Sequence, residues 1–207
     1  MIKLAWDTPR EWAERAVQQP LLLLSDHAHC ELRAATSAQA LITKNPTRRP
    51  LVERLAPLAI EELQHFRRVL GLLSELGGEL LPALPNPYMD GLLKGSAQTR
   101  TSTLLDRLLV AALIERRSHE RFVLLAEAST VPAMARLYAE LGPSEAGHGL
   151  LFVDLAQRDY PREDVDRRLA QLIEVEGAVM ASLGFDSRVH SGVAPSGIRA
   201  LRPTSVS

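Results

Sequence analysis

The sequence predicts an all-α protein: a four-helix bundle made of two helical hairpins joined by a long crossover, with extra N- and C-terminal helices. Three observations favour this class. Leu, Ala, Glu, Arg and Gln fill the stretches between regularly placed Pro and Gly residues, and all five favour helix. Aromatic residues make up only 4% of the chain, and strand signals are few. The 207 residues are 46% hydrophobic, which is enough for one sizeable core.

A short first helix is expected to begin at "TPREW". Thr8 is placed to cap it, Pro9 fits the first helical position, and Glu11 completes a capping box. This helix is expected to end before Pro20.

Two longer helices follow and are expected to form the first hairpin. One runs from about Pro20 to Lys44 and stops at "KNPTRRP", and the other covers about residues 51–76 and ends at Gly77 and Gly78. The next segment, "GELLPALPNPYMDGLLKGSAQTR", is rich in Pro and Gly and too long for a tight turn. It is therefore expected to be the crossover that divides the chain into halves.

The second hairpin is expected after this crossover. Its first helix is capped near Thr101 or Ser102 and ends around Ser129, and its second covers residues 132–159 with an interruption at "LGPSEAG". A last helix is expected over about residues 161–184.

Composition sets the limits on domain number and location. Residues 1–185 are expected to form a single domain, and residues 186–207, rich in Ser, Gly and Pro, a flexible tail. The chain has no run of about 18 uncharged apolar residues and no secretory pattern at its N-terminus, so we expect no membrane partner and a cytoplasmic location. The net charge of −1 indicates no polyanion partner by itself. Because Cys30 is the single cysteine, any metal site must use oxygen and nitrogen ligands.

Two copies of Glu-x-x-His lie on separate apolar segments. Glu62 and His65 form one pair in "EELQHF", and Glu145 and His148 form the other in "SEAGHG". Taken alone, each pair is more often a surface hydrogen bond or a solvated helix face. Their context argues for a shared site.

Each pair has a partner glutamate upstream. Glu31 precedes Glu62 by 31 positions, and Glu115 precedes Glu145 by 30 positions. The midpoints fall at the "KNPTRRP" and "ASTVP" turns, so in antiparallel hairpins these residues lie at one height, about 23 Å from each bend at about 1.5 Å per residue. The two hairpins also correspond with an offset of 83 or 84 positions, which indicates an internal duplication.

Four helices that each bring an acid to one level of a bundle predict a metal centre. Bare carboxylates in an apolar core are very costly unless they are paired or bound to cations. Glu and His three positions apart share a helix face, so each Glu-x-x-His pair is expected to hold one metal, and the upstream glutamates complete the shell. Four carboxylates balance two divalent cations and suit iron or manganese better than structural zinc, as in ferritin-like bundles. The predicted ligands are Glu31, Glu62, His65, Glu115, Glu145 and His148.

Three further side chains are candidates to surround the ligands. His27 lies one turn before Glu31 and His119 one turn after Glu115, so either is expected to support a ligand or to pack in the core. Tyr138 is a third candidate for this role. No separate catalytic acid or base is assigned.

Three other residues near the Glu-x-x-His pairs are not expected to bind the metals. Glu61 points about 100° around the helix from Glu62 and is expected to be solvated. Pro57 and Pro143 precede the two pairs, where a kink would leave room beside the metals.

The stretches "EELQHF", "ALIERRSHERF" and "EAGHG", with a long connection between the halves, resemble the bacterial tRNA hydroxylase family that acts on 2-methylthio-N6-isopentenyladenosine beside the anticodon. The resemblance covers about residues 7–185. "ERRSHERF" is its most specific phrase, because ferritins, rubrerythrins and several oxygenases share the bare ligand pattern. The resemblance implies a non-haem diiron centre with two iron ions on the six ligands named above, and O2-dependent hydroxylation of the isopentenyl group of a modified adenosine in tRNA.

This chemistry sets requirements for partners. An allylic methyl group offers no acidic proton and no leaving group, so a reduced iron pair that splits O2 suits it better than acid and base catalysis. The chain has no flavin or nicotinamide fingerprint, so electrons are expected from a separate reductase. The chain is expected to be a monomer or a small homo-oligomer. Arginine-rich helix ends are candidates for tRNA phosphate contacts, although solvated faces are the commoner role of such clusters. The candidate tRNA contacts are Arg48, Arg49, Arg116 and Arg117.

Two alternatives stay open from the sequence. A ferritin-like ferroxidase or a manganese catalase would use the same six ligands without an organic substrate. A helical-bundle interaction protein would carry the aligned acids and histidines by coincidence.

Overall fold

The computed structural model describes residues 2–98 and 102–193, and these residues form seven α-helices and no strand. The all-α prediction is confirmed. The helices are α1 (Arg10–Ala16), α2 (Pro20–Lys44), α3 (Arg49–Glu75), α4 (Pro87–Gln98), α5 (Thr103–Ala128), α6 (Pro132–Asp159) and α7 (Arg162–Ser182).

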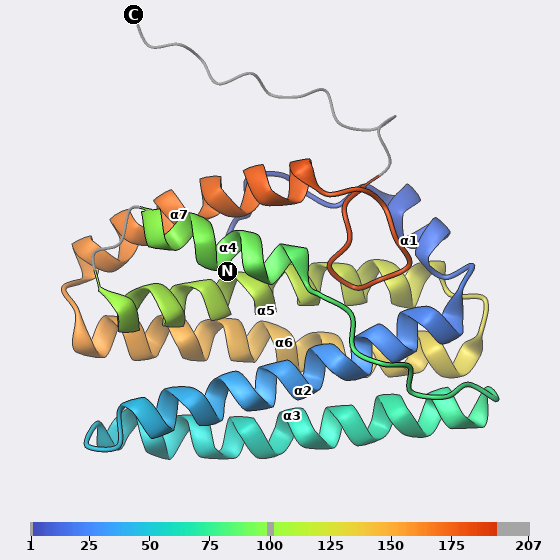
Figure 1. Cartoon of the computed structure of the whole chain (residues 1–207), viewed down its shortest axis with the longest axis horizontal. Coiled ribbons are helices and arrows are strands. Elements are labelled where there is room, and N and C mark those ends of the chain that lie inside the picture. The colour runs from blue at the N-terminus through green and yellow to red at the C-terminus, as the bar shows by residue number, and fades with distance from the viewer. Residues whose placement is uncertain (1, 99–101, 194–207) are drawn as a thin grey trace, which may run out of the picture.

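Two antiparallel hairpins, α2 with α3 and α5 with α6, form the four-helix bundle (Figure 1). The α3 helix also packs against α6, whereas α4 and α7 lie together over α5 (Figure 1). Proline at the first turn of α2, α3 and α6 fits the expected helix starts, since its missing N–H has no helical partner there. The hairpins and the crossover are therefore arranged as the sequence predicted.

The apolar core is divided into two clusters along the bundle. One cluster contains Leu55, Leu109 and Phe152, toward the α2–α3 turn. The other contains Leu24 and Leu73, toward the opposite end. Full burial of one such side chain stabilises the fold by about 1.5–3 kcal/mol, so each cluster is a substantial core. On each of the four long helices, the polar residues of the candidate site lie between the residues of one cluster and those of the other.

The crossover contains a helix that the sequence analysis did not predict. The Pro and Gly content of residues 78–100 indicated a connection, yet α4 occupies its second half. The glycines of α4 allow it to lie close to α7: a Cβ at Gly91 would lie 2.8 Å from Val179 Cγ1, and one at Gly95 would overlap Val175 Cγ1. Gly therefore marks a close helix contact here rather than a break in the helix.

Two local expectations were wrong. The α6 helix runs without a break through "LGPSEAG", with Pro143 inside it, because the surrounding packing outweighs the local preference of Pro and Gly. The first helix has Pro9 as its N-cap residue, without a side-chain cap. Thr8 instead binds Glu120 of α5 through its backbone N–H (2.9 Å) and its hydroxyl (2.7 Å).

The first part of the segment predicted to be a flexible tail, residues 186–207, is ordered against the rest of the protein. Residues 186–193 pack on the bundle, and Val189 is fully buried. Its N–H donates to Asp26 Oδ2 (2.9 Å), and Trp12 Nε1 donates to Ser191 Oγ (3.0 Å). Apolar and aromatic partners far away in sequence hold this segment, and the local Ser and Gly content does not reveal them. Residues 194–207 lie outside the described part of the chain.

Across the described residues, no helix is both long and apolar enough to cross a membrane.

Candidate metal centre

The structure brings all six predicted ligands together in the middle of the bundle. They come from all four long helices, as the spacing analysis required, and each is buried, with 1–6% of its surface exposed. The residues are Glu31 on α2, Glu62 and His65 on α3, Glu115 on α5, and Glu145 and His148 on α6.

The ligand atoms form two overlapping groups. One contains Glu31, Glu62, His65 and Glu145, and its ligand atoms all lie within 4.8 Å of one another. The second consists of Glu115 and His148 together with the same Glu62. Glu62 is therefore the residue shared by both groups.

Distances within the cluster show how the two imidazoles face the acids. His148 Nδ1 lies 2.9 Å from Glu62 Oε1, and His65 Nδ1 lies 3.4 Å from Glu62 Oε2 and 3.6 Å from Glu145 Oε1. Each Glu-x-x-His pair was expected to hold one metal, with Glu31 and Glu115 completing the shell. Glu62 shares a group with His65 and Glu31, and it also lies close to the histidine of the other pair, because α3 and α6 face each other across the site.

Burial and mutual repulsion perturb the carboxyl groups. Burial raises the pKa of Glu115 to about 7. Burial, together with the Glu115 and Glu31 carboxylates, raises the pKa of Glu145 well above its ordinary value. Burial also opposes ionisation of Glu31, but its interactions with His27, His65 and Glu62 together outweigh this effect and hold its pKa below the ordinary range. A cluster of this charge is stabilised by cations.

The two histidines show the complementary effect. Burial disfavours their charged forms, but interaction with Glu31 and Glu62 raises the pKa of His65 to about 9. The neighbouring Glu62 and Glu115 likewise raise the pKa of His148 to about 9. The site therefore attracts positive charge, which either protons or metal ions supply.

The side chains present fit a pair of metal ions. Several buried atoms form no well-aligned hydrogen bond within the protein, including both oxygens of Glu62, Glu145 Oε1, and the Nδ1 atoms of His65 and His148. A buried polar atom without a partner costs about 1–3 kcal/mol. These atoms point at one another, and metal coordination would satisfy them. Carboxylate and imidazole donors suit iron or manganese.

The three residues predicted to surround the ligands occupy different positions. His27 Nε2 lies 2.5 Å from Glu31 Oε1, so His27 orients a predicted ligand. Tyr138 stacks on the His27 ring with 5.3 Å between centroids. His119 Nδ1 instead binds the backbone carbonyl of Gly142 (2.8 Å), which supports α6 one turn before its glutamate.

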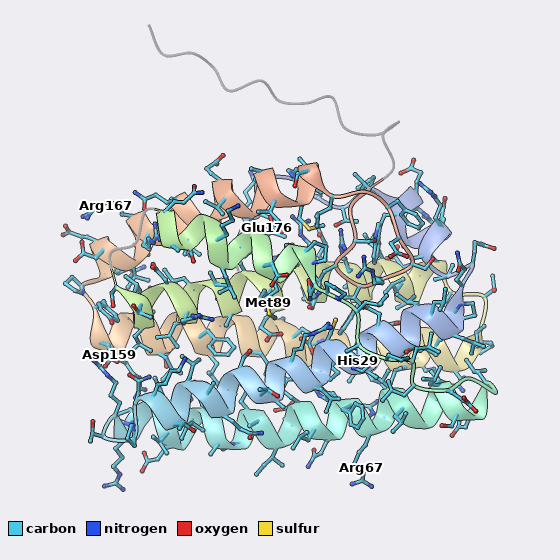
Figure 2. All side chains as sticks on the ribbon, in the orientation of Figure 1. His29, Arg67, Met89, Asp159, Arg167 and Glu176 are labelled. Carbon is cyan, nitrogen blue, oxygen red and sulfur yellow. The ribbon has the colours of Figure 1, made fainter. Side chains whose placement is uncertain are left out.

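An apolar groove lies between α2 and α5, beneath α4. It has a volume of about 360 Å³. A smaller cavity of about 50 Å³ lies beside it, and its walls include Glu115 and Phe152. Ser37, Met89 and Ala111 belong to the walls of both, so the groove and the cavity adjoin. Figure 2 labels Met89 between α4 and α2. The sequence did not predict this groove, because one of its walls is α4, and His190 of the C-terminal segment lines the adjoining cavity.

The four arginines proposed for tRNA contacts fall into two groups. Arg48 and Arg49 are exposed at the α2–α3 turn, where Arg48 Nη1 pairs with Asp159 Oδ2 (2.7 Å) at one end of the bundle (Figure 2). Arg116 donates to the Ile2 carbonyl (2.9 Å) and is half-buried.

Arg117 cannot contact tRNA in this structure, so that prediction was wrong. Its guanidinium is fully buried and forms two hydrogen bonds to Glu176, of 2.8 and 2.9 Å, and another to Glu120 (2.6 Å). The sequence shows a basic cluster at residues 116–121 but not which of its members point inward.

Two helical hairpins that enclose four carboxylates and two imidazoles at one level define a ferritin-like dimetal carboxylate protein. Comparisons with known proteins narrow this class. The model of the tRNA-(MS[2]IO[6]A)-hydroxylase (MiaE) family matches residues 2–191, and the chain belongs to this family.

Two curated relatives bear the name tRNA 2-(methylsulfanyl)-N(6)-isopentenyladenosine(37) hydroxylase. The Pseudomonas putida protein is 34% identical over 194 residues, which cover 92% of each chain. The Salmonella typhimurium protein is 29% identical, over 92% of this chain and 88% of its own. A solved structure of a Synechococcus protein with aldehyde deformylating oxygenase activity is also similar, with a TM-score of 0.86 and 39% identity, over 93% of this chain and 97% of that one.

Proposed function

We propose that the chain is an O2-dependent diiron monooxygenase that hydroxylates the isopentenyl group of 2-methylthio-N6-isopentenyladenosine next to the anticodon in tRNA. Family membership supports the reaction, and the buried cluster of acids and imidazoles supports the metal pair. The observation that carries the proposal is the apolar groove with an adjoining small cavity that is lined by Glu115. Such a reaction takes place where tRNA is found, in the cytoplasm.

The two parts of the groove suit the two parts of the substrate. The wide part is open along α2, where Ser37 and Lys44 are exposed, and has room for a flat purine base. The small part is closed by Phe152 and Ile114 and suits a branched hydrocarbon chain. Apolar walls exclude water and bring the prenyl carbons to the side of the cluster where Glu115 lies.

The chain's own residues bind and position. Glu62 and the other five ligands would hold two iron ions, and His27 would fix the orientation of Glu31. When bound and reduced, an iron pair supplies an O2-derived oxidant strong enough to remove a hydrogen atom from an unactivated carbon. The groove walls keep water from that oxidant.

The balance of the reaction requires an electron donor. Conversion of R–H and O2 to R–OH and water consumes two electrons and two protons. The sequence contains no flavin or nicotinamide fingerprint, so we propose a separate reductase as the donor. A monomer or a small homo-oligomer remains the expected state.

Basic side chains near the groove suit a nucleic acid. Lys44 and Arg107 line its wide part, and Arg48 and Arg49 lie at the adjoining α2–α3 turn. These four cations are placed to contact phosphates on either side of a base inserted in the groove. Their contribution would weaken binding as salt concentration rises.

Aldehyde deformylation is a second candidate, because the Synechococcus protein with that activity is 39% identical. An apolar groove also fits an alkyl chain. Conversion of R–CHO and O2 to R–H, formic acid and water would consume four electrons and four protons. The two candidates therefore differ in substrate and in product.

A direct test incubates iron-loaded protein, chemically reduced under O2, with an anticodon stem-loop that carries the prenylated adenosine. Mass spectrometry of the nucleosides is expected to show the addition of one oxygen atom. The Ala111→Phe variant, which fills the groove where its two parts meet, is expected to retain its metal and lose this product, whereas Ala139→Phe on the exposed face of α6 retains both. Formate release from a long-chain aldehyde, without oxidation of the stem-loop, would support the second candidate and refute the first.

A further inference from the structure

Outside the contacts among the six predicted ligands, three polar contacts lie along the contact line where α3 meets α6. Ion pairs lie toward its two ends, and the middle contact joins a surface carboxylate to a buried predicted metal ligand. The three contacts are Arg54 with Asp154 (3.0 Å), Glu61 with His148 (3.3 Å), and Arg68 with Glu140.

Glu61 reaches both predicted histidine ligands. Its Oε2 lies 3.3 Å from His148 Nε2, and its Oε1 lies 3.8 Å from His65 Nε2. The two imidazole rings are stacked with 5.8 Å between centroids, so one carboxylate spans both. The Glu61 side chain is 45% exposed, whereas those of His65 and His148 are 5% and 6% exposed. Glu61 was expected to be solvated, and it is instead half in solvent and half over the site.

The two nitrogens of each imidazole face different groups. The Nδ1 atoms of His65 and His148 face Glu62 within the cluster, and the Nε2 atoms face Glu61. An imidazole that gives Nδ1 to a metal must carry its proton on Nε2. A carboxylate beside that N–H fixes the tautomer and ring orientation and makes the imidazole a more basic ligand.

We propose that Glu61 is a positioning residue of the metal centre, whose carboxylate accepts hydrogen bonds from the Nε2–H groups of both His65 and His148 and orients their Nδ1 atoms toward the two metal ions. The geometry is favourable because each Glu61 oxygen faces a different ring, at 3.3 Å from His148 Nε2 and 3.8 Å from His65 Nε2. The proposal rests on the metal pair of the proposed function, but not on the identity of the organic substrate.

Glu61 and the groove reach the candidate metal centre from different sides. The groove approaches through α2 and α5 and reaches Glu115, whereas Glu61 approaches between α3 and α6. A change at Glu61 should therefore alter the metal ions without altering the walls of the groove.

Glu61→Ala, Glu61→Gln and Glu140→Ala form a matched set of variants. Glu140 belongs to the same contact line but pairs with Arg68 and not with a predicted ligand. Metal affinity would be measured by anaerobic titration with Fe2+ and with Co2+, and ligand geometry by Mössbauer spectra of iron-57 protein and absorption spectra of the cobalt form. Thermal unfolding of each metal-free variant would report changes in packing.

Glu61→Ala is expected to lower metal affinity about 10–100-fold and to alter both spectra, which is the usual effect of removing a partner of a ligating histidine. Glu61→Gln is expected to recover part of the affinity, because the amide oxygen still accepts one hydrogen bond. Glu140→Ala is expected to leave affinity and spectra unchanged.

Two outcomes would overturn the proposal. One is a Glu61→Ala protein with unchanged affinity and spectra. The other is an equal effect of Glu140→Ala, which would assign the change to the contact line as a whole. Because these readouts need no tRNA, a wild-type protein that fails to oxidise the stem-loop would refute the proposed function and leave the assignment of Glu61 intact.

Discussion

At the residue scale, Glu62 holds the central position because it belongs to both ligand groups. Its loss should therefore affect both metals. Glu62→Ala is expected to reduce iron from about two ions per chain to nearly none, whereas Glu31→Ala and Glu115→Ala each disturb one group and are expected to retain about one ion, as a two-metal site predicts. Elemental analysis with Mössbauer spectroscopy on iron-57 protein measures this. Equal loss in all three variants would contradict the shared role of Glu62.

Protons and metal ions compete for the same residues, which predicts a dependence on pH. The pKa values of His65 and His148 are raised to about 9 in the metal-free protein, so their stabilising effect is complete below about pH 6.5 and is lost as pH rises through about 9. Metal ions bind only the deprotonated imidazoles, so metal affinity rises as pH rises. We expect the Tm of the metal-free protein to fall between pH 6.5 and 9 while the affinity for Co2+ rises. Calorimetric scans and titrations across this range would detect both changes, and a flat affinity would refute the competition.

Most residues of the candidate site could be predicted from the sequence, because their spacing reflects helix geometry. A rise of about 1.5 Å per residue places Glu31 opposite Glu62 without further information. Burial was harder to predict: Arg117 has the sequence context of a phosphate ligand, yet its guanidinium binds Glu176 from α7, a helix that spacing does not place. Glu61 was misjudged for the opposite reason. The prediction that Glu61 points away from Glu62 around α3 was correct, but in that direction its side chain meets His148 of α6 instead of solvent alone.

At the element scale, α4 depends on its glycines for its contact with α7. Gly95→Ala would place a methyl group against Val175 Cγ1, and overpacking of this kind costs about 1–3 kcal/mol. The variant is expected to lower the free energy of unfolding by an amount in this range and to loosen α4 over the groove. Denaturant unfolding and hydrogen exchange of residues 87–98 would measure the two effects.

Gly71→Ala provides the matched control for this prediction. A Cβ at Gly71, on the exposed face of α3, meets no atom within 4 Å, so this substitution is expected to stabilise the helix by about 0.5–1 kcal/mol. Val175→Ala combined with Gly95→Ala is expected to restore stability. Equal effects of Gly95→Ala and Gly71→Ala would show that helix propensity alone determines the result.

The four long helices were predictable because Pro and Gly mark their ends and apolar periodicity marks their faces. The α4 helix was missed because the same two residue types serve a different purpose there, and the break predicted in α6 was wrong because its neighbours hold Pro143 within the helix. The segment 186–193 was assigned to a tail because its anchors, such as Trp12 and Asp26, lie near the other end of the chain. In all three cases long-range packing decides the structure.

At the scale of the whole molecule, the layer of predicted metal ligands separates two apolar cores. One core contains Leu55 and Leu109, the other Leu24 and Leu73, and the six predicted ligands lie between them. Each core contains buried apolar side chains from all four long helices. The metal-free protein is therefore expected to fold, with a weak layer of mutually repelling carboxylates at its centre.

Metal binding should remove that weakness and couple the two cores. A ligand that binds only the native state stabilises it by about 4 kcal/mol at one thousand times its Kd, so iron loading is expected to raise Tm by several degrees and chelation to reverse the change. Amide hydrogen exchange in the middle of α2 and α5 is expected to slow on loading more than exchange near the helix ends. Glu62→Ala should abolish both effects, because it removes the residue that the two metal groups share. A wild-type protein whose Tm and exchange rates are indifferent to iron would contradict the metal centre and leave a helical bundle with accidental alignment of its acids.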